Sequence, residues 1–330
     1  MSGCAERASL RHARGAPPVG RLAPSPTGFL HLGHARSFLL AYWHARSRAG
    51  FLKLRLDDLD GERCRPEFAD AALFDLEWLG LEWDGPVYRQ SQGRNAMIRA
   101  AVGLVARSLA YPCVCSRSEI RALQNAPHGD DGEQRYPGTC RGRYRSLAAA
   151  EGETSRPAGI RFIVADAPVT IADGFAPATT FDVAAQSGDF LIARRDGRPA
   201  YQLAVVLDDA HQGVTEVVRG SDLLASTARQ RLLQSALGLT APRTFHVPLV
   251  VDASGRRLAK RADDLSLRDL RASGIDARAI VAWAARSAGI DAPERVGVGE
   301  VTSVFDLERV PRDPVVVTER TVQSLGFERR

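Results

Sequence analysis

Residues 21–37, RLAPSPTGFLHLGHARS, decide the fold. This segment begins at the end of a short strand, which is expected over 19–22. It continues through a loop rich in Pro and Gly and ends in an amphipathic helix, which is expected over 33–49. Residues 51–56 alternate apolar and basic side chains, which is typical of a second strand. Strand, loop, helix and strand form a βαβ unit, whose ligand site lies at the carboxyl ends of the strands and the N-terminus of the helix. The sequence therefore predicts an α/β fold with a Rossmann-like, doubly wound parallel sheet.

The composition excludes several other classes of protein. The chain has 330 residues, 45% hydrophobic and 25% charged, as expected for a globular protein of about two domains. It has no apolar run of about 18 residues, so we expect no membrane partner. Five cysteines are too few and too unevenly spaced for a disulfide-rich scaffold. The net charge of +5 permits a polyanionic partner without requiring one.

Only two of the 44 basic residues are lysines, Lys53 and Lys260. Codon bias in a GC-rich genome explains the excess of arginine. Each remaining lysine is nevertheless a candidate for a specific role.

We expect five segments along the chain. Residues 1–17 are interpreted as a disordered extension of a cytoplasmic bacterial protein, with a mitochondrial presequence as the alternative. The other four are the first half of a nucleotide-binding fold (18–90), an acceptor-binding insertion (91–190), the second half (191–262), and a small helical subdomain with a tail (263–330). Further helices are expected over 66–80, 90–109, 222–237 and 276–288, and further strands over 201–207 and 214–218. An apolar run covers 245–251.

The tetrapeptide HLGH (31–34) places two imidazoles at the expected start of a helix. Unpaired backbone N–H groups and the positive end of the helix dipole lie there, and Gly28 and Gly33 let a phosphate or base approach the backbone. This arrangement suits the triphosphate of ATP, whose oxygens gain charge when the α-phosphate is attacked. His31 and His34 are therefore candidate catalytic donors. The alternative is a helix start with two surface histidines.

A second basic motif, RLAKR (257–261), follows a Ser-Gly turn. A mobile loop of this kind can close over a triphosphate, with the Lys260 ammonium as a point charge on the phosphates. The alternative is a solvated basic loop.

Three cysteines, Cys113, Cys115 and Cys140, lie within 28 residues of an otherwise polar segment. Soft ligands in this number favour a tetrahedral zinc site, although Cys-x-Cys is tighter than the usual spacing. The alternative is a trio of reduced cysteines. Both Tyr136 and His128 lie in the same segment and are candidates for a fourth ligand.

The order and spacing of HLGH and RLAKR resemble the HIGH and KMSKS signatures of class I aminoacyl-tRNA synthetases. The resemblance narrows to the glutamyl-tRNA synthetase branch and extends over most of residues 18–265. It is carried by 21–37, by RLDDLD (55–60), by EWLGLEWDGPVYRQSQ (77–92) and by VVLDDAHQGVTEVVRGSDLL (205–224).

The resemblance implies site residues for both substrates. Glutamate has two carboxylates that call for guanidinium groups and an ammonium that calls for an acid. The implied glutamate-binding residues are Arg21, Leu22, Ala23, Pro24, Ser25, Asp57, Tyr201 and Arg219. The implied ATP-binding residues are Pro24, Ser25, Thr27, Gly28, His31, Gly33, His34, Arg257, Leu258 and Lys260, of which His31, His34 and Lys260 are catalytic. For Arg21 and Arg219 the alternative is a structural ion pair, and Asp208 and Asp209 are expected to have supporting or helix-capping roles.

The cysteine segment resembles that of the glutamyl-queuosine tRNA(Asp) synthetases, which carry C-x-C and Y-x-x-x-C at this place. The resemblance implies one structural zinc ion bound through Cys113, Cys115, Tyr136 and Cys140, and it favours Tyr136 over His128. Residues 262–330 give only 69 positions, which fits one small helical subdomain and leaves no room for an anticodon-binding domain.

The implied reaction has two steps. Glutamate reacts with Mg-ATP to give glutamyl-adenylate, and a hydroxyl of queuosine in the anticodon stem-loop of tRNA(Asp) then accepts the glutamyl group. A monomer is expected. The alternatives are a truncated or non-discriminating glutamyl- or glutaminyl-tRNA synthetase that charges a 3′ end, a nucleotidyltransferase that makes cofactors, and a catalytically silent RNA-binding paralogue.

The sequence departs from the family pattern at three places. Ala259 and Arg261 replace the two serines of KMSKS, so only Lys260 keeps its role there. Asp57 stands where related chains often have Glu, which is one methylene longer. The acidic segment 129–133 is not expected to contact RNA phosphates.

Overall fold

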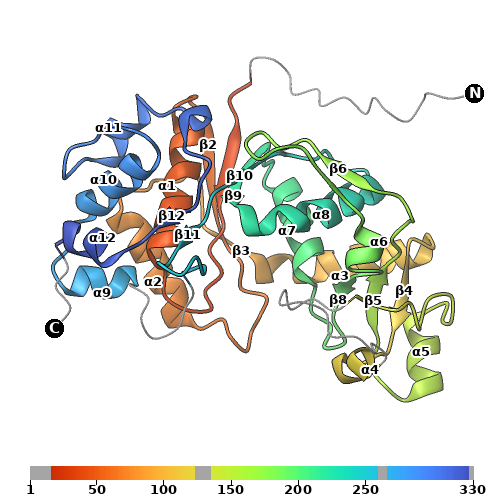
Figure 1. Cartoon of the computed structure of the whole chain (residues 1–330). Helices are drawn as coiled ribbons and strands as arrows, with labels where there is room; N and C mark the ends of the chain where they lie inside the picture. Colours follow the sequence, from red (N-terminus) through yellow and green to blue (C-terminus); the bar gives the residue numbers. More distant parts are fainter. Residues whose placement is uncertain (1–15, 123–134, 259–265, 327–330) are drawn as a thin grey trace, which may run out of the picture.

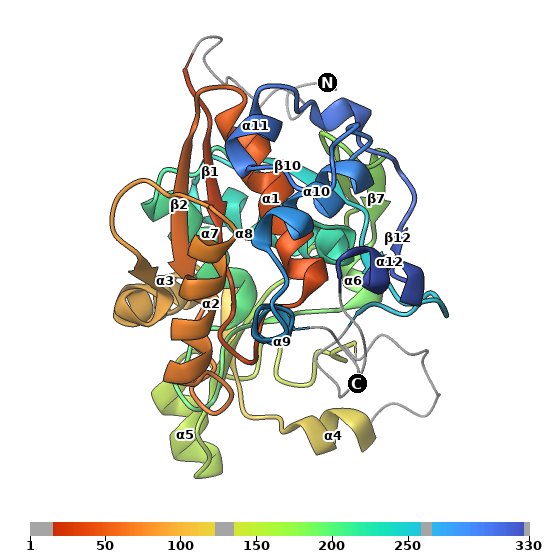
Figure 2. The ribbon, with the colours of Figure 1, turned by 90° about the vertical axis from the view of Figure 1, so that its left-hand side faces the viewer.

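The computed structural model describes residues 16–122, 135–258 and 266–326. Its first half is the expected βαβ unit, in which β1 (Val19–Leu22) and β2 (Phe51–Leu56) flank α1 (Leu32–Arg46). Figure 2 shows β1 and β2 side by side; they pair in parallel, and β3 (Tyr88–Arg89) pairs in parallel with β2. The predicted α/β class is confirmed.

The second half repeats this arrangement on the other side of β1. Strands β9 (Glu216–Gly220) and β10 (Arg243–Val247) pair in parallel, and α8 (Leu224–Leu237) connects them. The backbone N–H of Thr215 donates to the carbonyl of Val19, which places β9 beside β1. Figure 1 shows these strands passing through the centre of the molecule.

The strand expected over 201–207 is wrong, because these residues form the first part of α7 (Tyr201–His211). An apolar run of seven residues fits a buried strand and a buried helix equally well. The helix extends beyond this run to His211, and two residues that follow the run, Asp208 and Asp209, are also buried. This correction moves Tyr201 and Gln202 to the N-terminus of a helix.

The insertion between the two halves has its own antiparallel sheet, seen to the right in Figure 1. Strands β4, β5 and β8 form this sheet, and β6 and β7 form a hairpin. Helices α3 and α7 cover the sheet, and with α8 they share a second apolar core. The bounds are α3 (Arg94–Ala106), β4 (Ala110–Cys113), α4 (Arg117–Ala122), α5 (Leu147–Thr154), β5 (Gly159–Phe162), β6 (Val169–Ile171), β7 (Thr179–Phe181), α6 (Val183–Gln186) and β8 (Leu191–Ala193).

The C-terminal residues pack on α1 and share its core. Trp43 is fully buried and donates its indole N–H to the carbonyl of Val298 (3.1 Å). Arg36 is also fully buried and donates to the Pro248 carbonyl and the Ser287 hydroxyl (2.8 Å each). The helix expected over 276–288 is confirmed as α10 (Ala277–Ser287).

Short elements follow α10, where an irregular tail was expected. The remaining bounds are α2 (Pro66–Trp78), β11 (Val250–Val251), α9 (Leu267–Ala272), α11 (Val298–Thr302), β12 (Val315–Val316) and α12 (Glu319–Ser324), with single 3-10 turns at Gln90–Gly93, Ser221–Leu223 and Leu307–Arg309. Within the described residues, no helix has the length and apolar character needed to cross a membrane.

Candidate active site

The two histidines of HLGH lie together at the N-terminus of α1. His31 caps the helix, because its Nδ1 accepts the backbone N–H of Gly33 (3.1 Å). The backbone N–H of His31 donates in turn to Nδ1 of His34 (3.3 Å), and the two ring centroids are 3.8 Å apart. Since Nδ1 is the acceptor in both neutral rings, both carry their proton on Nε2. The helix start thus carries two imidazole N–H donors beside its positive dipole end.

The second basic motif lies only partly within the described residues. Lys260, Ala259 and Arg261 are outside them, as is His128. Arg257 forms an ion pair with Asp222 and a strand bridge with Val251. Residue Ser266, on the other side of the motif, forms a strand bridge with His31. The described flank that follows the motif is therefore held directly against HLGH.

Buried charges lie where β1, β2 and α7 meet. Arg55 is completely buried and donates to Oδ1 of Asp57 and to Oδ1 of Asp209 (2.7 Å each). Arg21 is also buried; its Nη1 donates to the Val218 carbonyl (3.4 Å), and its Nε lies 3.8 Å from Asp209 Oδ1. Within the described residues, this Nε has no hydrogen-bond partner. Among the described residues, Nη2 of Arg55 is also without a hydrogen-bond partner. A buried N–H without a partner is costly, so this group carries donors that the described residues leave unsatisfied.

Burial also shifts the pKa values of this group. Burial raises the pKa of Asp57, against the opposing effect of Arg55 and Arg21. Burial likewise raises the pKa of Asp208 to about 6, although Arg55 and Gln90 favour its charged form. Asp208 and Asp209 lie within α7 and contact Gln90 and Arg55.

A cavity of about 770 Å³ opens in front of these charges. Four of the predicted residues line it, namely Ser25, Thr27, Asp57 and Tyr201. Arg21 and Arg219 are not among its lining residues; both are buried behind it, on the neighbouring strands β1 and β9. The predicted Leu22 is fully buried in the core, so its side chain offers nothing to a ligand.

The backbone of the predicted loop is tied to the cavity. The Pro24 carbonyl accepts the N–H of Asp57 (3.0 Å), and the Ser25 carbonyl accepts the N–H of Thr27 (2.8 Å). Ala23 and Gly28 belong to this same loop. The loop therefore connects the cavity to the histidines of α1.

Several residues that line the cavity were not predicted from the sequence. Gln90, Gln202 and Arg229 come from three different elements, and no local pattern connects them. The arginines at 117 and 121 follow Cys115 at helical spacing, which was a usable signal. The cavity lining includes six arginines but only two aspartates, and is therefore suited to a polyanion; these residues are Arg63, Arg117, Arg121, Arg161, Arg194, Arg229, Asp57 and Asp60.

The three predicted cysteines form one cluster. The Sγ atoms of Cys113, Cys115 and Cys140 all lie within 4.8 Å of one another. The Tyr136 hydroxyl lies 3.4 Å from Cys113 Sγ and 3.5 Å from Cys115 Sγ. Arg161 lies 3.7 Å from the centroid of the Tyr136 ring, and its Nε donates to Cys113 Sγ (3.3 Å). Three sulfurs and one oxygen beside a guanidinium fit a cation bound by anionic ligands.

Comparisons with known proteins agree with this fold. The family model described as "tRNA synthetases class I (E and Q), catalytic domain" matches residues 19–321. The chain thus contains a class I tRNA synthetase catalytic domain.

Curated relatives narrow the assignment. The Glutamyl-Q tRNA(Asp) synthetase of Symbiobacterium thermophilum is 43% identical over 93% of this chain and 98% of that protein. The one from Nitratidesulfovibrio vulgaris is 45% identical over 82% of this chain and 86% of that protein. The chain therefore belongs to the glutamyl-Q tRNA(Asp) synthetase family.

A solved structure confirms the fold. The glutamate tRNA ligase from Elizabethkingia meningosepticum, in complex with its amino acid, superposes with a TM-score of 0.76 at 24% identity. The match covers 94% of this chain and 69% of that one.

Proposed function

We propose that this enzyme activates L-glutamate with ATP and transfers the glutamyl group to queuosine in the anticodon of tRNA(Asp). The observation that carries the proposal is the placement of the cavity. Ser25, Thr27, Asp57 and Tyr201 line it, the loop from Ser25 to Gly28 leads from it to HLGH, and buried arginines stand behind it.

In the first step, the α-carboxylate of glutamate attacks the α-phosphate of ATP and pyrophosphate leaves. The Nε2–H groups of His31 and His34 donate to phosphate oxygens as these gain charge, and the Lys260 ammonium offsets charge on the leaving pyrophosphate. Mg²⁺ bound to ATP would neutralise part of the triphosphate charge. The enzyme contributes position and electrostatics and forms no covalent intermediate.

The glutamate contacts follow from the buried charges. Asp57 accepts hydrogen bonds from the α-ammonium group. Arg21 and Arg219 offer guanidinium groups to the carboxylates from behind the cavity, and Tyr201 closes it from the start of α7.

In the second step, a hydroxyl of the queuosine ring attacks the mixed anhydride, the glutamyl ester forms and AMP leaves. The arginines of the cavity wall suit the phosphates of an RNA loop. Cys113, Cys115, Tyr136 and Cys140 would hold one structural zinc ion, which would stabilise the fold of the insertion. Because tRNA is a cytoplasmic acceptor, the enzyme acts in the bacterial cytoplasm. A monomer is also expected.

The activation step is tested by ATP–pyrophosphate exchange in the absence of tRNA. We expect label to enter ATP with L-glutamate and Mg²⁺. We expect much less label with L-aspartate, whose side chain is one methylene shorter, or with L-glutamine, whose side chain has no carboxylate. No exchange with glutamate would refute the activation step.

A further inference from the structure

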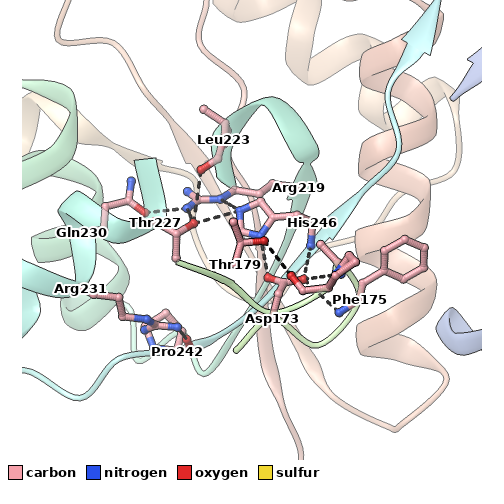
Figure 3. A network of polar contacts seen from close by, with 12 residues as sticks. Asp173, Phe175, Thr179, Arg219, Leu223, Thr227, Gln230, Arg231, Pro242 and His246 are labelled. Carbon is pink, nitrogen blue, oxygen red and sulfur yellow. Dashed lines mark hydrogen bonds and ion pairs between the residues drawn. The ribbon is translucent and has the colours of Figure 1, made fainter. Parts of the chain in front are cut away.

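The polar network around Arg219 contains two residues to which no role has been assigned, Asp173 and His246. His246 lies on β10, and Asp173 lies in the loop of the β6–β7 hairpin, within the insertion. Figure 3 shows the imidazole of His246 between the carboxylate of Asp173 and the guanidinium of Arg219. The side chains of Asp173 and His246 are fully buried.

The two ring nitrogens of His246 have different partners. Nδ1 lies 2.6 Å from Oδ2 of Asp173. Nε2 accepts a hydrogen bond from Nε of Arg219 (3.1 Å) and lies 3.0 Å from the Thr227 hydroxyl. An ionised carboxylate only accepts, so Nδ1 must carry the proton. The Arg219 N–H in turn requires a bare Nε2. His246 is therefore neutral, with its proton on Nδ1.

The pKa directions agree with this protonation state. Burial alone would raise the pKa of Asp173, but hydrogen bonds from the His246 ring and from backbone N–H groups outweigh it and lower this pKa to about 2. The pKa of His246 is also lowered, chiefly by burial and further by the positive charge of Arg219, against the opposing effect of Asp173.

The rest of the Arg219 guanidinium is held equally firmly. Its Nη2 donates to the Thr227 hydroxyl (2.8 Å) and to Oε1 of Gln230 (2.7 Å). Gln230 donates in turn to Gln202, which lines the cavity. Among the described residues, these hydrogen bonds use Nε and Nη2 of Arg219 and leave Nη1 out of them.

Asp173 is itself fixed by the backbone around it. Its Oδ1 accepts the N–H groups of Phe175, Ala176 and His246 (2.9 Å each). The N–H of Gly174 donates to the Thr244 carbonyl (2.8 Å), which ties the loop to β10. A Cβ on Gly174 would lie 2.2 Å from the Phe245 ring, so this close approach requires glycine.

We propose that Asp173 and His246 are positioning residues for glutamate, acting through the orientation of Arg219. Asp173 stabilises the tautomer of His246 that carries its proton on Nδ1. The unprotonated Nε2 then accepts a hydrogen bond from Nε of Arg219. This hydrogen bond orients the guanidinium so that Nη1 can bind a substrate carboxylate. This inference rests on the proposed role of Arg219 in glutamate binding. It gives the insertion a part in amino-acid recognition, because Asp173 comes from its hairpin.

Asp173→Asn is the decisive variant, since it reverses the tautomer and removes one buried negative charge while keeping the size of the side chain. The carbonyl oxygen of the introduced amide can keep the three backbone hydrogen bonds, while the NH2 group of that amide replaces Oδ2 and faces Nδ1. Nδ1 of His246 must then accept a hydrogen bond, so the ring carries its proton on Nε2. The Nε2–H and the Nε–H of Arg219 would then be two donors that face each other. We expect the KM for glutamate in ATP–pyrophosphate exchange to rise roughly 10- to 100-fold, with the KM for ATP within about twofold of its original value.

Asp182→Asn is the matched control. Asp182 lies in the same insertion and caps α6 through the N–H of Ala185, a role that Asn also performs. This variant is expected to leave both KM values unchanged. At His246, Gln offers an oxygen near the position of Nε2 and should largely keep the KM for glutamate, whereas Leu should raise it as Asp173→Asn does.

A purely structural role gives a different result. If Asp173→Asn leaves the KM for glutamate within twofold, or shifts the KM values for glutamate and ATP equally together with the thermal midpoint, the positioning role is refuted.

The tautomer provides a readout that needs no activity. Long-range 1H–15N correlation spectra of the unaltered enzyme, with His246 assigned by its loss in His246→Gln, should show a neutral ring protonated at Nδ1. Protonation at Nε2, or at both nitrogens, overturns the proposal. Absence of glutamate-dependent exchange in the unaltered enzyme would count against the proposed function, while the tautomer would still decide the geometry around His246.

Discussion

Arg55 shows how single residues prepare this site. It is completely buried and binds Asp57 and Asp209, two carboxylates that come from different halves of the fold. Removing one partner of such a group would leave a buried charge unpaired, at a cost of about 3–5 kcal/mol. Arg55 therefore holds Asp57 in place, and Asp57 in turn faces the cavity.

The two lysines of the chain differ in their expected importance. Lys260→Arg should lower the glutamate-dependent exchange rate by at least about tenfold, because the compact ammonium acts as a point charge on the phosphates and a planar guanidinium does not reproduce it. Lys53→Arg is the matched control. Lys53 is a half-buried residue of β2, and its Nζ donates only to the Asp84 carbonyl (3.3 Å) among the described residues. Equal losses in the two variants would contradict the role of Lys260.

The site residues that could be predicted from the sequence are those that belong to a short, contiguous motif. His31 and Gly33 form a helix start that is readable from four consecutive letters, and the structure places them at that start. Gln90 had no such signal, because its partner Asp208 is 118 residues away. His246 and Asp173 were missed for the same reason, since their contact depends on how the insertion folds onto β10.

Among the elements, the alternating segment 51–56 was predictable, and the apolar run 201–207 was not. The strand β2 was expected over 51–56 and is found at those residues. The run 201–207 has apolar residues on every side, so its periodicity could not distinguish a strand from α7. The error matters for the site, because the N-terminus of α7 carries Tyr201 and Gln202 into the cavity wall.

The cysteine cluster connects a strand and two loop segments of the insertion, and a bound metal should stabilise all three. The purified enzyme should contain about one zinc ion per chain, as measured by inductively coupled plasma mass spectrometry. Cys140→Ser should lose the ion and lower the thermal midpoint, because it removes one of the clustered thiols. Cys64→Ser serves as the control, because Cys64 lies outside the cluster and should keep the zinc. Equal zinc content in the two variants would refute the site.

The complete fold joins three parts around the candidate site. The two halves of the nucleotide-binding fold contain HLGH and Arg219. The insertion contributes Arg117, Arg121 and Arg161 to the cavity lining, and its hairpin carries Asp173. The C-terminal helices complete the core beneath α1. Arg312, from the C-terminal part, donates to the Phe175 carbonyl and lies 3.8 Å from the centroid of the Phe175 ring, so it also supports the loop that carries Asp173.

The central claim is that glutamate goes to queuosine and not to the 3′ end of a tRNA. The direct measurement incubates the enzyme with labelled glutamate, ATP and tRNA(Asp) that either contains or lacks queuosine. In each case, a portion of the tRNA is first trimmed of its 3′-terminal adenosine, which removes the ordinary acceptor and leaves the anticodon untouched. We predict labelling only of tRNA that contains queuosine, and that this labelling persists after the 3′ end has been trimmed. Labelling that ignores queuosine and disappears with the 3′-terminal adenosine would contradict the claim and identify an enzyme that charges 3′ ends.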